Sequence, residues 1–119
     1  MDTSTYVLME NAQATATITG TAAWEAIMRL KPALIFGDNW FQECPGLFKI
    51  NNVKGCREAL NFIKSGNFKV SQEEIIRFLF AFEAVTMRGN FYFFAKKEST
   101  VDEEANVNNF YGYIAQALR

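Results

Sequence analysis

The segment that begins at Ser71 and contains the mostly apolar stretch 75–87 predicts a long helix. Ser71 precedes Glu74 by three residues, the spacing of a capping box, in which side chains and backbone satisfy two amide groups at a helix start. From Ile75 to Met87 only three residues are polar or charged, so little of this helix surface suits contact with water. We therefore expect this helix to be buried on most sides and to form the centre of the protein.

A strand is expected directly after this helix. Gly89 is a suitable left-handed residue to close the helix. The aromatic residues 91–94 follow it, and a strand without polar alternation is typical of a sheet that is covered on both faces. The core is therefore expected to include residues of both elements, namely Phe78, Leu79, Phe82 and Phe93.

Three shorter strands are predicted in the first half of the chain. Apolar and polar residues alternate over residues 12–19, which is the period of a half-buried strand, although a helix is an alternative for the first half of this segment. The apolar run 33–36 predicts a buried strand, and residues 47–50 alternate around Lys49. Turn-forming residues begin at Gly37, so the segment up to residue 46 is expected to be an irregular loop.

Three further helices are predicted around these strands. Residues 22–30 form the first, with Thr21 as its N-cap. Residues 52–66 form the second, because their apolar residues recur every three or four positions. The last helix follows Thr100, which makes a second capping-box pair with Glu103.

Helices and short strands are mixed without a regular strand–helix–strand repeat. This order predicts an α+β fold with a small, mostly antiparallel sheet, covered on one face by a single layer of about four helices. A chain of 119 residues, half of them hydrophobic, is long enough for its own core. We expect one globular domain over residues 1–119, with residues 1–5 frayed.

The net charge and the length of the apolar stretches argue against two classes of partner, nucleic acids and membranes. The chain carries 12 basic and 13 acidic residues and a net charge of −1, whereas non-specific nucleic-acid binding depends on a basic excess. No stretch reaches the length of apolar sequence that spans a membrane, and the first residues lack the pattern of a signal peptide. We therefore expect a cytoplasmic protein without a nucleic-acid or membrane partner.

The residue types that most often perform catalysis or bind metals are scarce. The chain has no histidine and two cysteines, Cys44 and Cys56, too few ligands for a zinc site. We expect both thiols to be free, with Cys56 buried on its helix and Cys44 in a loop, the more reactive setting, where Glu43 would raise its pKa. Asp38 and Glu43 could form an acid–base pair, but a turn aspartate and a solvated glutamate are the simpler interpretation. No catalytic, cofactor-binding or metal-binding residue is predicted.

Aromatic residues outside the expected core are candidates for an interface. Trp40 and Phe41 lie in the polar loop, where exposed rings would anchor a partner and buried rings would form a satellite cluster. Phe110, Tyr111 and Tyr113 point in too many directions for a single buried helix face, so at least one ring is expected at the surface.

Two functions from different classes fit these observations. The first is a non-enzymatic protein–protein interaction module, such as a small adaptor, an immunity-type protein or an inhibitor encoded by a phage or plasmid. Its partner would be another protein or a second copy of the chain in a homodimer. The alternative is a small-molecule-binding domain, or a small enzyme, with a pocket near Trp24, Trp40 and Phe41.

Overall fold

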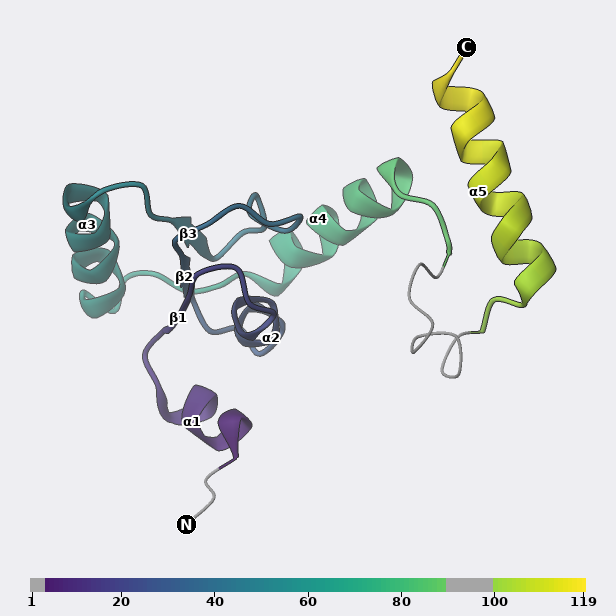
Figure 1. The fold of residues 1–119 in the computed structure, drawn as a ribbon. Helices are drawn as coiled ribbons and strands as arrows, with labels where there is room; N and C mark the ends of the chain where they lie inside the picture. Colours follow the sequence, from purple (N-terminus) through teal and green to yellow (C-terminus); the bar gives the residue numbers. More distant parts are fainter. Residues whose placement is uncertain (1–3, 90–99) are drawn as a thin grey trace. The chain divides into compact units, whose positions relative to one another are not determined.

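A computed structural model describes residues 4–89 and 100–119 (Figure 1). The fold is α+β, as predicted, with five helices rather than about four and three strands in the described part of the chain. The chain groups into two compact units, the first ending at Leu79 and the second beginning at Phe80. The single domain therefore stays a prediction, and each unit is described by itself. The elements in order are α1 (Thr5–Asn11), β1 (Thr15–Thr17), α2 (Ala22–Met28), β2 (Ala33–Ile35), β3 (Leu47–Lys49), α3 (Val53–Lys64), α4 (Gln72–Val85) and α5 (Glu103–Ala117).

The sheet of the first unit is parallel, so the antiparallel prediction was wrong. Its order is β1-β2-β3, and Ala33 of β2 pairs with Thr15 on one side and Leu47 on the other. Helix α2 carries the chain back from β1 to β2, and the loop 36–46 does so from β2 to β3. Parallel neighbours require such long crossovers, and the loop gave no helical pattern from which its crossover could be predicted.

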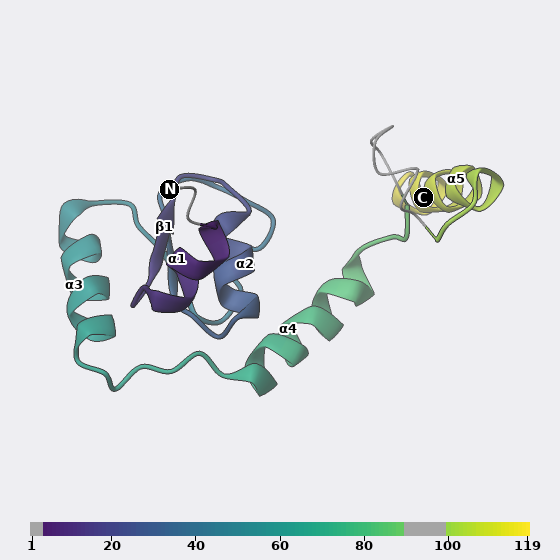
Figure 2. The same cartoon turned by 90° about the horizontal axis from the view of Figure 1, so that it is seen from below.

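Strand β2 is buried on both faces and forms the centre of the first unit. Ala33 and Ile35 pack in one cluster with residues of α2, whereas Leu34, on the opposite face, packs with Ala59 of α3. Figures 1 and 2 both show the strands between α2 and α3. The prediction of a single helix layer on one face was therefore wrong, because these helices cover opposite faces.

The loop 36–46 contributes to the core although it has no regular structure. Phe41 and Cys44 are almost fully buried in the cluster that contains Ile35. At the end of the loop Gly46 has φ +92°, and a Cβ there would lie 2.9 Å from Cγ2 of Val70. Glycine is required at this position, because both the conformation and the space exclude a side chain.

Helix α4 is exposed along most of its length, so its prediction as the buried centre was wrong. Ile75 is its only buried residue and Phe78 packs partly against the core, but Leu79 is exposed and Phe82 only half-buried. Within the first unit, only one side of the first turns of α4, with Ile75 and Phe78, packs against the core. Phe93 and the strand 91–94 lie outside the described residues.

The helix starts were predicted better than the helix ends. Ser71 and Asn52 accept hydrogen bonds from the amides of Glu74 and Gly55, at 3.3 and 2.8 Å. Helix α5 instead begins with Asp102, which accepts from the amide of Ala105 at 2.8 Å, and not with Thr100. Asp102 has the same acceptor chemistry two residues later.

Two helix ends differ from the prediction. Helix α4 ends at Val85, and Gly89 is not left-handed. Helix α2 ends at Met28, two residues early, because Leu30 adopts a left-handed φ of 58°. The amides of Leu30 and Lys31 donate to the carbonyls of Ile27 and Ala26, which is the Schellman arrangement usually closed by glycine.

Ile35→Ala should lower the free energy of unfolding of the first unit by about 2–5 kcal/mol, because it leaves a cavity in the buried strand. Ile18→Ala, next to the same sheet, should cost less than about 1 kcal/mol, since Ile18 is 69% exposed and Ile35 0%. Urea unfolding followed by the fluorescence of Trp24 and Trp40, both in the first unit, measures this difference. Equal losses for the two variants would contradict the position of β2 in the core.

Candidate functional site

The carboxyl ends of the three strands meet at one edge of the sheet because the strands are parallel. Backbone hydrogen bonds between neighbouring segments continue just past the strand ends. The amide of Gly37 donates to Ile18 O at 2.9 Å, and the amide of Ile50 donates to Ile35 O at 2.8 Å. A Cβ on Gly37 would lie 2.6 Å from Cγ2 of Thr19, so glycine permits this close approach. In open parallel sheets ligands bind outside this edge.

An open groove of about 590 Å³ lies at this edge, between the residues after β2 and β3 and the first turns of α3. Its apolar lining residues are Phe36, Ile50, Val53, Cys56 and Leu60. Its polar lining residues are Asn51, Asn52, Arg57 and Asn61. An apolar surface with a few polar groups at its border is the usual composition of a small-molecule site.

The packing of α3 explains which of its residues line the groove. Asn52 fixes the start of the helix by capping the amide of Gly55, and Ala59 is buried against Leu34 of the sheet. Residues four positions apart lie on the same side of a helix. Cys56 and Leu60 therefore reach the groove together, as do Arg57 and Asn61.

Arg57 gives the groove a positive charge. It forms no ion pair with any residue that the structure describes, and no acidic residue lines the groove. The nearby cation Lys54 differs, because its Nζ lies 3.8 Å from Oε1 of Glu58. The charge of Arg57 is therefore available to a bound molecule.

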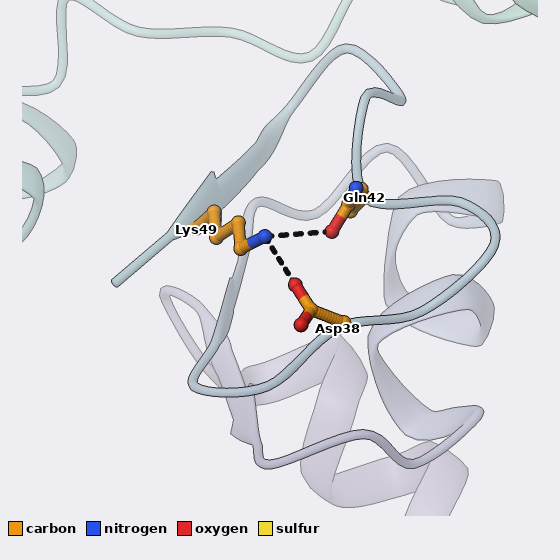
Figure 3. A network of polar contacts seen from close by, with 3 residues as sticks. All are labelled: Asp38, Gln42 and Lys49. Carbon is orange, nitrogen blue, oxygen red and sulfur yellow. Dashed lines mark hydrogen bonds and ion pairs between the residues drawn. The ribbon is translucent and has the colours of Figure 1, made fainter. Parts of the chain in front are cut away.

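Lys49 holds the loop 36–46 against β3 (Figure 3). Its Nζ forms an ion pair with Oδ1 of Asp38 and donates a hydrogen bond to Oε1 of Gln42 at 2.9 Å. Asp38 thus pairs with a cation at the surface, and Glu43 is exposed. Asn39, next to Asp38, has a buried side-chain amide whose two polar atoms find no hydrogen-bond partner among the described residues.

The predicted interface residues of the loop differ in exposure. The rings of Trp24, Trp40 and Phe41 form one cluster with centroids 4.9–5.5 Å apart. Trp40 is 55% exposed, whereas Phe41 is 1% exposed and belongs to the core. These three residues do not line the groove described above. The sequence therefore identified a real aromatic cluster, but the groove lies elsewhere.

The other predicted interface residues lie on α5, in the second unit. Phe110 is half-buried, while Tyr111 is 75% and Tyr113 49% exposed. No residue of α5 is buried. The expectation that at least one of these rings lies at the surface is confirmed.

The two cysteines are free thiols, as predicted, but Cys44 rather than Cys56 is the buried one. Cys44 is buried in the loop, and burial, rather than Glu43, raises the pKa of its thiol to about 11. Cys56 is only half-buried and lines the groove. Within the described ranges no three His, Cys, Asp or Glu side chains are grouped to hold a metal ion. No described helix has the length and apolar character needed to cross a membrane.

Sequence reasoning missed the polar residues of the groove. Asn51 and Asn52 directly follow a predicted strand, and Arg57 and Asn61 are four residues apart on a predicted helix. If the sheet had been predicted to be parallel, these positions would have been expected at the carboxyl edge of the sheet, where ligands bind. In the predicted antiparallel sheet the ends of neighbouring strands lie at opposite edges, so these residues were not expected to meet.

Comparisons of the chain with protein-family models, with curated proteins and with solved structures found no match.

At pH 8, iodoacetamide should alkylate Cys44 in the folded protein about a hundredfold more slowly than in the urea-unfolded chain. A pKa of about 11 in place of the usual 9.0 lowers the thiolate fraction by that factor, and burial slows the reaction further. In the folded protein, Cys56 should react faster than Cys44. Peptide mass spectrometry at successive times measures both rates.

The same burial predicts a pH dependence. The stability that the neutral Cys44 thiol confers should be complete below pH 9 and should fall as the pH rises toward 11. Cys44→Ala should remove this part of the alkaline loss. A folded protein in which Cys44 reacts as fast as Cys56 would contradict the buried position.

Proposed function

We propose that the first unit is a small-molecule-binding domain and that its ligand binds in the groove beside α3. One observation supports this most strongly: the groove lies at the carboxyl edge of a parallel sheet that helices cover on both faces. In that architecture the loops after the strands are held by a rigid sheet, so they can present a fixed surface to a ligand.

The size and lining of the groove favour a small organic molecule. Its volume of about 590 Å³ lies within the roughly 300–1,000 Å³ that is usual for such sites. Phe36 and Leu60 are both about half exposed at the groove, so a ligand would remove apolar surface from water. Nine residues line the groove, fewer than the roughly 20–30 residues that each partner contributes to a stable protein interface.

Binding without chemistry fits the lining better than catalysis. The lining residues include no carboxylate, and the chain has no histidine to act as a general base. Cys56 is the only nucleophilic side chain of the groove, and no lining residue is a general base that could take its proton. We therefore propose a binding domain rather than an enzyme.

Cys56 provides a direct test of this proposal. Fragments found by ligand-observed NMR should slow the alkylation of Cys56 by about tenfold when present at ten times their Kd, because only the ligand-free protein reacts. Leu60→Glu should abolish binding by placing a charge in the apolar lining, whereas Phe80→Glu, at an exposed position of the second unit, should have no effect.

Two results would contradict the small-molecule site. In the first, no fragment protects Cys56. In the second, the fragments bind the Leu60→Glu variant as tightly as the unchanged protein.

A second candidate function, a protein–protein interaction module, has its support in the second unit. Helix α5 has no buried residue, and several of its large apolar side chains are exposed. They are Val107, Tyr111, Tyr113 and Ile114, and Leu118 directly after the helix is exposed as well. Exposed apolar residues on neighbouring turns are typical of a surface that binds another protein or a second copy of the chain.

Sedimentation equilibrium tests the homodimer version of this second proposal. The unchanged protein should associate at high micromolar concentration, and Ile114→Arg should raise the dissociation constant at least about tenfold by placing a charge in an apolar interface. The control is Asn108→Arg, which adds the same charge at an exposed polar position of α5 and should have little effect. A protein that stays monomeric would exclude the homodimer and leave a different protein as the partner.

A further inference from the structure

We propose that the groove beside α3 is specific for an organic anion with a flat apolar body, and that Arg57 binds the anionic group. This inference rests on the proposed function and adds the chemical class of the ligand. It depends on three features of the groove: a cation without an acidic partner among the described residues, several side-chain amides, and an apolar lining that includes the aromatic ring of Phe36.

The charge of the groove selects the sign of the ligand. Arg57 is the only charged residue among the nine that line it, and it has no ion pair with a described residue. Glu58, its neighbour in the chain, is paired with Lys54 at 3.8 Å and does not line the groove. A cationic ligand would meet repulsion without compensation, whereas a carboxylate could accept two parallel hydrogen bonds from the guanidinium group.

The asparagines of the groove add directed hydrogen bonds. The Oδ1 atom of Asn52 accepts from the amide of Gly55 at 2.8 Å, which leaves the Nδ2 group of Asn52 as its donor. Asn51 and Asn61 also line the groove and carry amide groups of the same kind. Amide donors beside a guanidinium group favour oxygen anions, because each can donate to a different oxygen lone pair.

The apolar lining determines the body of the ligand. Phe36 follows β2 at one side of the groove and Leu60 lies on α3, and both expose about half of their surface. A planar ring can stack on Phe36 and contact Leu60 while its anionic group reaches Arg57 on the same helix. Because the groove is open to solvent, weak binding with Kd on the order of 1 mM is expected for a two-ring compound.

A matched pair of probes separates charge from shape. Naphthalene-2-carboxylate and naphthalene-2-carboxamide have the same ring system and nearly the same size, but only the first is an anion. The carboxylate should bind about tenfold more tightly in NMR titrations, because a charge-assisted hydrogen bond is stronger than a neutral one. Added sodium chloride should weaken binding of the carboxylate and leave the amide unchanged.

Substitutions of two neighbouring cations test the role of Arg57. Arg57→Gln should reduce the affinity for the carboxylate to that for the amide, and Arg57→Lys should retain part of the preference. Lys54→Gln is the control, because Lys54 is a cation of the same helix that does not line the groove. Both positions are exposed, so these variants should fold normally.

The outcomes distinguish this inference from the proposed function. If both probes protect Cys56 from iodoacetamide and bind equally well, the anion specificity is wrong and the small-molecule site remains. A preference for the carboxylate that survives Arg57→Gln would also overturn the role of Arg57. If neither probe binds or protects Cys56, this inference is overturned, and the fragment experiment then decides the proposed function separately.

Discussion

Burial of strand β2 on both faces is the constraint on which the first unit depends. Three residues, Ala33, Leu34 and Ile35, are removed from water, so each face of the sheet needs its own cover. Helix α2 and the loop 36–46 supply one cover, and α3 supplies the other. The two crossovers, α2 and the loop 36–46, both lie on the first face and make the strands parallel. The second face is covered by α3, which follows the last strand.

The groove is a consequence of this arrangement. Parallel strands bring the chain to the same edge each time, and α3 starts directly from that edge after Asn52. Because α3 uses Ala59 to pack on the sheet, the adjoining positions of the helix are directed toward the edge and into the groove. The helix that covers this face of the sheet therefore also lines the groove, together with the residues that follow β2 and β3.

Helix α4 has a largely apolar sequence but only one buried residue. Ile75 lies in the core cluster of the first unit and Phe78 packs against it, whereas Ile76 and Leu79 in the same part of the helix are exposed. The second unit begins within this helix and exposes apolar side chains on α5 as well. The two proposed functions belong to different units, so neither proposal depends on the other.

The sequence by itself determined the local features of this protein. It located the buried run at β2, the loop 36–46, the helix starts at Asn52 and Ser71 and the two free thiols, because these depend on neighbouring residues. It did not determine the strand direction, the exposure of α4, the burial of Cys44 or the groove residues. These depend on which distant segments cover each face of the sheet. An apolar pattern shows that a residue can be buried, but only the tertiary structure decides whether enough surface is present to bury it.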